Sequence, residues 1–144
     1  MYKNLNLSLL LAASMCVCAA IAHFACIPIG APAYRFLGAG EVMASMAEHG
    51  HIYPDVMSSI IGTLLLLWSA YAFAAAGLFA PLPFSKWMLL LIAFVLLARA
   101  VFGYPLLKNS FPDNSLMFWW VSSSICFVMG IAFALGLKQI WKTV

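Results

Sequence analysis

The stretch that decides the fold reads VMSSIIGTLLLLWSAYAFAAAGL and runs from Val56 to Leu78. It carries no charged residue and is longer than the roughly 20 residues that a helix needs to cross a hydrocarbon core about 30 Å thick. Its apolar residues do not alternate with polar ones, as they would in a strand of a membrane barrel. Because backbone groups in lipid must find hydrogen-bond partners within the segment, this stretch predicts a membrane-spanning helix.

Three further stretches of the same kind lie before and after it, separated by residues that end or cap helices. Gly103 and Pro105 are expected to close the third span, and the run Pro112-Asp113-Asn114-Ser115 is expected to start the fourth as a capped N-terminus. The sequence therefore predicts an all-α integral membrane four-helix bundle that forms a single transmembrane domain. The predicted spans cover about residues 5–27, 56–78, 87–104 and 116–137 of the 144.

The composition excludes several classes of protein. Hydrophobic residues make up 66% of the chain and charged residues only 8%, whereas soluble domains carry roughly 25% charged residues. Disordered chains are poor in apolar residues, so disorder is excluded by the same numbers. The net charge of +3 is spread without a basic run, which argues against a nucleic-acid partner. The partner that the composition predicts is the lipid bilayer.

The positions of lysine and arginine predict how the chain lies in the membrane, because these residues are commoner in cytoplasmic loops. One set of span ends carries four lysines, whereas the other carries Arg35 and Lys108 among three acids. We therefore expect a multi-pass protein of the cell inner membrane with both termini in the cytoplasm. The four lysines are Lys3, Lys86, Lys138 and Lys142; the three acids are Glu41, Glu48 and Asp113.

The first span also has features of a secretory signal peptide, because Lys3 precedes the apolar run and small residues follow it at Cys18, Ala19 and Ala20. The apolar run continues past these residues to Ile29, however. We therefore expect this segment to be a retained membrane span.

Residues 28–54 form the only long connection, on the outer side of the expected topology. The segment from Gly40 to Gly50 predicts a short helix with a glycine stop. Val42, Met43 and Met46 share one side of it, which suits a helix lying on the membrane surface. We favour a lid packed over the bundle, with a binding site as the alternative.

Small residues recur every four positions in the first and fourth spans. Such stripes let membrane helices approach closely, because packing rather than hydrophobicity drives their association. They predict a compact bundle in which these two helices face their neighbours. The stripes are Ser8, Ala12, Cys16 and Ala20, and Ser122, Cys126, Gly130 and Ala134.

Four cysteines and three histidines raise the question of redox or metal chemistry. Cys16 and Cys18 are one residue apart, so on a helix they point in different directions, and there is no C-x-x-C motif. We interpret the cysteines as small packing residues. The histidines lack further ligands at metal-binding spacings. We therefore predict no cofactor and no metal site, and we assign no catalytic residue.

Arg99 is the most informative single residue, because no other lysine or arginine lies inside a predicted span. A charge at this depth costs roughly 2.5–3.5 kcal/mol on insertion scales and is usually paired or functional. We predict a polar cluster in the outer half of the bundle in which Arg99 pairs with one of three acids. A substrate or proton site is the alternative. The predicted cluster consists of Arg99, His23, Asp55, Glu41 and Glu48.

Several short motifs give the chain a family resemblance. They are Gly38–Ala44, Ala47–Gly50, Tyr53–Pro54, Trp68–Ala72 and Ala76–Leu78, together with Gly30–Pro32 and Arg99. With these motifs the stretch from about Ala22 to Gly103 resembles a family of small four-helix bacterial inner-membrane proteins. The resemblance implies the four-helix topology and no particular chemistry.

Three classes of function stay open on the sequence. We favour an accessory or assembly subunit of a larger membrane complex, because the chain is small and has few polar interior groups. The partners are then other membrane subunits or further copies of the chain, and we expect no enzymatic activity. The first alternative is an oligomeric small transporter or channel that uses the polar cluster. The second is a membrane enzyme that acts on a lipid or quinone with His23 as acid or base.

Overall fold

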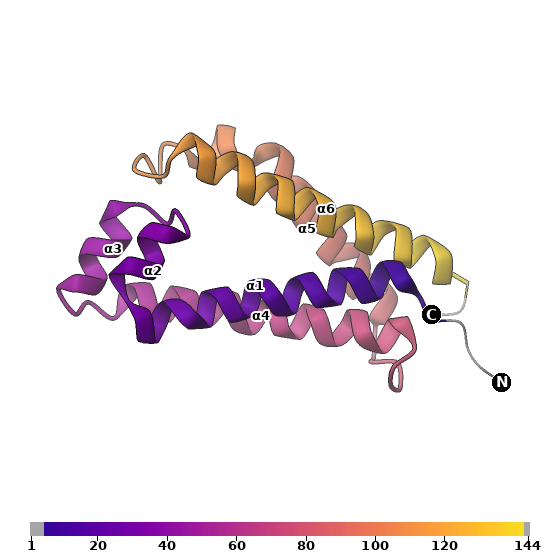
Figure 1. Cartoon of the computed structure of the whole chain (residues 1–144). Coiled ribbons are helices and arrows are strands. Elements are labelled where there is room, and N and C mark those ends of the chain that lie inside the picture. Colours follow the sequence, from indigo (N-terminus) through magenta and orange to yellow (C-terminus); the bar gives the residue numbers. More distant parts are fainter. Residues whose placement is uncertain (1–4, 143–144) are drawn as a thin grey trace.

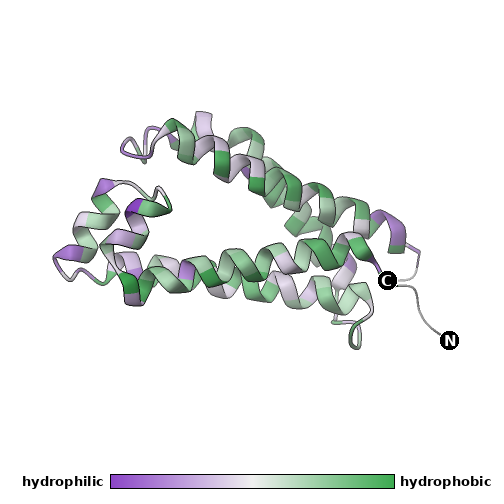
Figure 2. Cartoon of the chain, in the orientation of Figure 1, coloured by the Kyte–Doolittle hydropathy of each residue, from purple (hydrophilic) through white to green (hydrophobic). Residues whose placement is uncertain are grey.

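The computed structural model describes residues 5–142, and within this part of the chain every regular element is a helix (Figure 1). Four of the helices are long and apolar enough to cross a membrane, which confirms the predicted all-α, multi-pass fold. Figure 2 shows that hydrophobic residues predominate along the length of these helices. The elements are α1 (Leu7–Ile29), α2 (Ala31–Phe36), α3 (Glu41–Glu48), α4 (Tyr53–Ala76), α5 (Ser85–Leu107) and α6 (Leu116–Ile140).

The predicted helix ends are partly right. The expected cap of the fourth span is present, and it is the last residue of the predicted run: the Ser115 hydroxyl accepts a hydrogen bond from the Phe118 N–H at 3.1 Å. Gly103 and Pro105 do not close the third span, however, and α5 continues to Leu107. Pro105 lacks only its own N–H, and the Lys108 N–H still donates to the Tyr104 carbonyl at 3.1 Å. A proline this close to a helix end therefore removes too little to stop the helix.

The four long helices form two pairs, with α1 packed on α4 and α5 packed on α6 (Figure 1). The pairs meet where α1 begins and α6 ends, which we call the terminal end. There the Asn6 side chain donates to the Gly136 carbonyl at 3.0 Å and accepts from the Leu9 N–H at 3.0 Å. A Cβ at Gly136 would lie 2.5 Å from Leu9 Cγ, so the glycine permits this crossing of α1 and α6.

The predicted small-residue stripes do lie at helix contacts. Ala12, Cys16 and Ala20 are completely buried in the main core. Gly130 of α6 is buried too, and a Cβ there would lie 2.8 Å from Leu97 of α5. These positions let each helix approach its neighbour, as the sequence predicts.

At the opposite end, which we call the loop end, the pairs move apart and the segment carrying α2 and α3 lies between them (Figure 1). The links from this segment to the α6 side pass through two glycines. A Cβ at Gly38 would lie 3.0 Å from Phe118 Cβ, and one at Gly40 would lie 2.5 Å from Asn114 Oδ1. Both glycines have positive φ, at 75° and 90°. The connection to α6 therefore depends on residues without side chains.

Helix α3 forms where the sequence predicts it. Its fully buried residue is Ala44, and Met43 packs beside it in a small core with Tyr34 of α2. Val42 is 50% exposed, so of the predicted apolar side of Val42, Met43 and Met46 only Met43 belongs to this small core.

Candidate functional site

Arg99 lies in the last third of α5, near the loop end, and its side chain extends toward that end. A Cβ at Gly103 would overlap its Nη1 atom, so the guanidinium lies directly over this glycine, one turn further along. Helical side chains usually lean toward the N-terminus of their helix. Gly103 removes the obstacle on the other side, and this explains why Arg99 takes the less usual direction.

The guanidinium is enclosed between α5 and α6. Its Nη2 atom donates a hydrogen bond of 3.3 Å to the Ser122 hydroxyl, and Cζ lies 5.1 Å from the centre of the Trp119 ring. Trp119 is 4% exposed, and Tyr104 packs edge-on against it with ring centres 6.0 Å apart. A cation over an indole face is stabilised by about 0.5–2 kcal/mol. The site is therefore an aromatic and hydroxyl cradle for one positive charge.

One donor of this site has no partner. The Nη1 atom is buried and makes no hydrogen bond to any residue in the described range 5–142. An unsatisfied buried donor costs about 1–3 kcal/mol, and more when it is charged. The site therefore lacks an acceptor.

Within the described residues the structure does not form the predicted ion pair between Arg99 and an acid. Among residues 5–142 both ion pairs belong to Arg35, which the predicted cluster does not include. Arg35 donates through Nη2 and Nε to Glu41, at 2.5 and 3.0 Å, and through Nη1 to Glu48 at 2.6 Å. Arg35 is six residues from Glu41, so this local pair orders less chain than a pair reaching α5.

These contacts join α2 to α3 on the exposed side of the loop end. The hydrogen bonds from Arg35 hold the pKa values of Glu41 and Glu48 below their usual range, and those carboxylates raise the pKa of Arg35. All three groups lie at the surface, where such pairs are screened by solvent. We therefore interpret them as holding α3 in place.

Asp55 pairs with neither Arg99 nor Arg35, and its partner is Tyr34. The Tyr34 hydroxyl of α2 donates to Asp55 Oδ1 at 3.2 Å, and it lies 3.2 Å from the Ser58 hydroxyl. Burial raises the pKa of Tyr34. Because Asp55 and Ser58 are one turn apart at the start of α4, a single tyrosine attaches α2 to that helix.

His23, the remaining member of the predicted cluster, is partly buried in α1 and makes no hydrogen bond to a residue in the described range. It follows Cys16 by seven residues and therefore lies on the same side of α1. Within the described residues no group of three His, Cys, Asp or Glu side chains could hold a metal ion. The structure thus does not bring the five predicted residues together: Arg99 contacts Ser122, Glu41 and Glu48 share Arg35, and Asp55 binds Tyr34.

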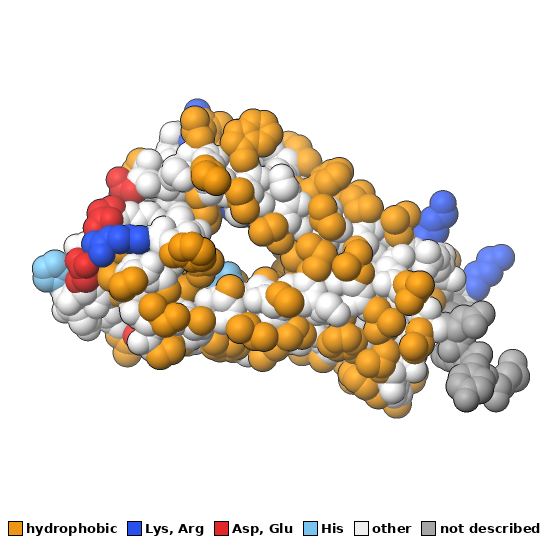
Figure 3. Space-filling view, in the orientation of Figure 1, with side chains coloured by type: hydrophobic (Ala, Val, Ile, Leu, Met, Phe, Trp, Pro, Cys, Tyr) orange, Lys and Arg blue, Asp and Glu red, His pale blue; other side chains and the backbone are white. Residues whose placement is uncertain are grey.

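Figure 3 shows an opening through the molecule between the two helix pairs, on the loop-end side. Hydrophobic side chains surround most of it, and it runs across the long axes of the helices (Figures 1 and 3). In a bilayer such an opening faces the hydrocarbon sideways. The opening is therefore a lateral one, and it does not form a pore that runs along the helices.

Comparisons with protein-family models, curated proteins and solved structures gave no match to this chain. The family resemblance carried by the motifs between Ala22 and Gly103 therefore stays a prediction.

Proposed function

We propose that this small multi-pass membrane protein is an accessory or assembly subunit of a larger membrane complex, and that a partner helix docks beside Arg99. The observation that carries the proposal is a guanidinium inside a span that forms no ion pair among the described residues, while its side chain is only partly buried. A partner carrying a carboxylate or an exposed carbonyl would supply what this chain lacks.

The energies favour an external acceptor. A positive charge inside a span costs roughly 2.5–3.5 kcal/mol, and the contacts to Ser122 and Trp119 offset only part of this cost. Paired charges across helix interfaces are the usual solution, because they satisfy both groups at once. Arg99 as a whole is only partly buried, so a neighbouring helix has access to its side chain.

The packing of the helices also supports a partner. In each span only 28–33% of the residues in the most apolar window are buried, so most of their surface is free for lipid or protein. The two pairs separate toward the loop end, which leaves apolar surface on both sides of the opening. If the four helices packed only against one another, closing this gap would bury more of their apolar surface.

We propose that the protein lies in the cell inner membrane with both termini in the cytoplasm. Lys86, Lys138 and Lys142 all lie at the terminal end, as do the start of α1 and the end of α6. Lys108 and Arg35 lie at the loop end together with the acids. This distribution supports the proposed orientation.

Purification from the native membrane in a mild detergent tests the docking proposal. The wild-type chain should copurify with a different protein in a constant ratio, and Arg99→Leu should reduce that ratio at least tenfold. Lys108→Leu is the matched control, because it removes one positive charge from the exposed end of α5. Purification as a single chain or only with copies of itself would contradict the proposal, as would an unchanged complex in Arg99→Leu.

One observation favours a second candidate, a membrane enzyme that acts on a lipid or quinone. The lateral opening would admit such a molecule from the bilayer. A lipid or quinone that purifies with the chain in a one-to-one ratio, without a protein partner, would favour this candidate over the first. The oligomeric transporter or channel has less support, because the residues of its predicted polar cluster have separate partners.

A further inference from the structure

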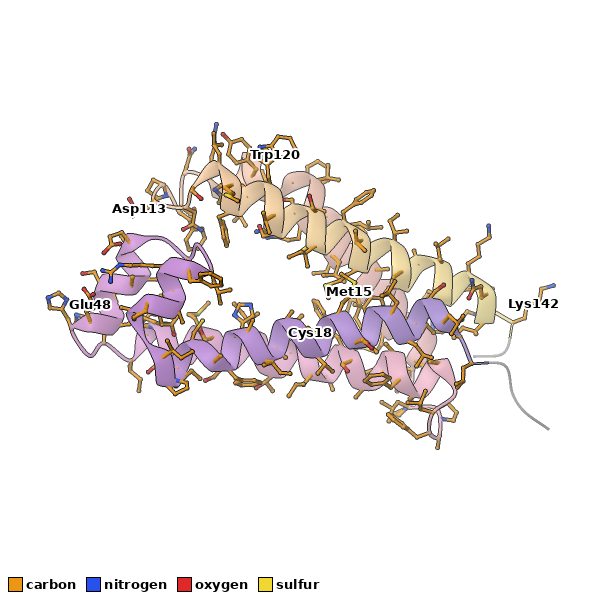
Figure 4. The ribbon with its side chains drawn as sticks, viewed as in Figure 1. Met15, Cys18, Glu48, Asp113, Trp120 and Lys142 are labelled. Carbon is orange, nitrogen blue, oxygen red and sulfur yellow. The ribbon has the colours of Figure 1, made fainter. Side chains whose placement is uncertain are left out.

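A groove of about 600 Å³ lies between α5 and α6 at the terminal end. Its floor is apolar and is formed by Leu90 and Ala93 of α5 and by Ala134 and Leu137 of α6. Its rim is polar and includes Lys138 and Lys142, which are one helical turn apart. The groove therefore leads from the hydrocarbon depth to a pair of positive charges at the membrane surface. Figure 4 shows Lys142 at this end of the molecule.

The rim is held in place by a contact between the two helices. Lys86 of α5 places its Nζ 4.0 Å from the ring centre of Trp141, which also lines the groove. Tryptophan is typical of the interface between hydrocarbon and headgroups, so this contact sets the rim at headgroup level. It also brings a third positive charge to the rim.

Within residues 5–142 no acidic side chain forms an ion pair with these lysines. The sequence contains four acidic residues, and all of them lie in segments of the loop end. Figure 3 shows acidic side chains at that end and lysines at the other. The groove thus has an apolar floor and a cationic rim that no acidic side chain of residues 5–142 neutralises. The four acids are Glu41, Glu48, Asp55 and Asp113.

We propose that this groove binds one anionic phospholipid, with an acyl chain along the floor and the phosphate between Lys138 and Lys142. The volume lies in the range of small-molecule sites, and basic pockets between membrane helices suit anionic headgroups. A free phosphate group would use the rim but leave the floor empty. The charge and the floor together therefore select a lipid whose headgroup carries a net negative charge.

Native mass spectrometry of the purified chain in detergent tests the proposal. The probes are palmitoyl-oleoyl phosphatidylglycerol and the phosphatidylcholine with the same acyl chains, which differ in headgroup charge. Phosphatidylglycerol should bind more tightly, with one molecule held to the highest detergent concentration. The double variant Lys138→Gln/Lys142→Gln should weaken it by roughly 30-fold, at about fivefold per lysine. Lys108→Gln, which removes one positive charge at the other end of the molecule, should change the affinity less than twofold.

A second variant tests the floor while leaving the charges intact. Leu90→Trp puts a bulky side chain into the groove, whereas Leu91→Trp places one on a neighbouring position outside the groove. Both leucines are exposed, at 42% and 53%, so both variants should fold. Leu90→Trp should lower phosphatidylglycerol binding at least tenfold, and Leu91→Trp should leave it unchanged.

Three results would overturn the proposal. The first is equal affinity for the two lipids, and the second is an equal effect of the two tryptophan variants. The third is displacement of phosphatidylglycerol by soluble glycerol phosphate at the same concentration, which would show that the phosphate group alone accounts for binding. The experiment uses the isolated chain, so its outcome does not depend on the partner proposed for Arg99.

Discussion

Gly103 and Arg99 form one structural unit, because the guanidinium occupies the space that a side chain at position 103 would need. Replacing an interior helical glycine by alanine normally stabilises a helix by up to about 1 kcal/mol. At Gly103 we expect the opposite sign, with a loss of about 1–3 kcal/mol, because the new methyl group would push a charge out of its cradle. Thermal unfolding in detergent micelles measures the change.

Removing the guanidinium provides the control for that substitution. In an Arg99→Leu background Gly103→Ala should be neutral or stabilising, since the atoms that the methyl group would meet are gone. A stabilising Gly103→Ala in the wild-type chain would mean that Arg99 does not lie over this glycine.

The sequence identifies Arg99 as an unusual residue but does not reveal which group contacts it. Its position inside an apolar span is evident from composition alone, and so is the need for a compensating group. Three acids in or next to one long loop are equally plausible partners on the sequence. What decides between them is Arg35, which lies in the same loop and takes Glu41 and Glu48. The spacing of these three charges within 28–54 is the signal that could have identified the local pairs.

At the scale of elements, Tyr34 is the residue that attaches α2 to α4. Tyr34→Phe removes a hydroxyl with contacts to Asp55 and Ser58, and we expect it to cost about 1–2 kcal/mol of stability. Tyr53→Phe is the matched control, because that ring is 49% exposed near the same end. Equilibrium unfolding followed by circular dichroism should show the loss in the first variant alone. Equal losses in both would remove the special role of Tyr34.

The attachment of α3 should depend on pH. The folded-state pKa values of Glu41 and Glu48 are lowered, so their contribution is complete above the ordinary carboxyl pKa of about 4.3 and is lost as the pH falls below it. A spin label at Val42, in a chain whose four cysteines are replaced by alanine, should become more mobile only below about pH 4.

The control is a variant that carries the same spin label but lacks the two titrating carboxyl groups. In Glu41→Gln/Glu48→Gln the label should be mobile at pH 7 already and should change little as the pH falls. A transition between pH 6 and 7, where histidines titrate, would contradict the assignment to these carboxyls.

The long elements could be predicted from the sequence, whereas their relative placement could not. Apolar length gives the four spans, and the cap at Ser115 and the stop at Gly50 give two of the ends. The short helix α2 was missed because Pro32 reads as a helix breaker, although it occupies the first turn, where proline is tolerated. The face used by α3 depends on contacts with α2, so its own periodicity could not reveal it.

At the scale of the whole molecule, the separation of the two helix pairs is the feature that no local sequence pattern predicts. It results from a tight crossing of α1 and α6 at Gly136 and from the insertion of α2 and α3 at the other end. Both are long-range contacts between segments far apart in the sequence. The small-residue stripes predict a compact bundle, and the structure has close contacts within the pairs but an opening between them.

The proposed orientation gives a simple prediction at this scale. A reporter that is active only in the periplasm should be active when inserted at Gly50, in the turn after α3, and inactive when fused after Val144. A cytoplasm-specific reporter should give the reverse pattern. Periplasmic activity after Val144 would reverse the topology, and with it the leaflet in which the groove between α5 and α6 would bind lipid.

The central claim is that a partner protein lies beside Arg99 in the membrane, and photo-crosslinking in intact cells tests it most directly. A photoreactive phenylalanine at Phe102, three residues from Arg99 and 56% exposed, lies on the neighbouring face of α5. The same group at Phe94, which is 69% exposed, points to a different side of that helix and serves as the control. We predict one discrete protein adduct from position 102, which is lost in Arg99→Leu, and none from position 94. Adducts of equal yield from both positions, or no protein adduct from position 102, would contradict the account.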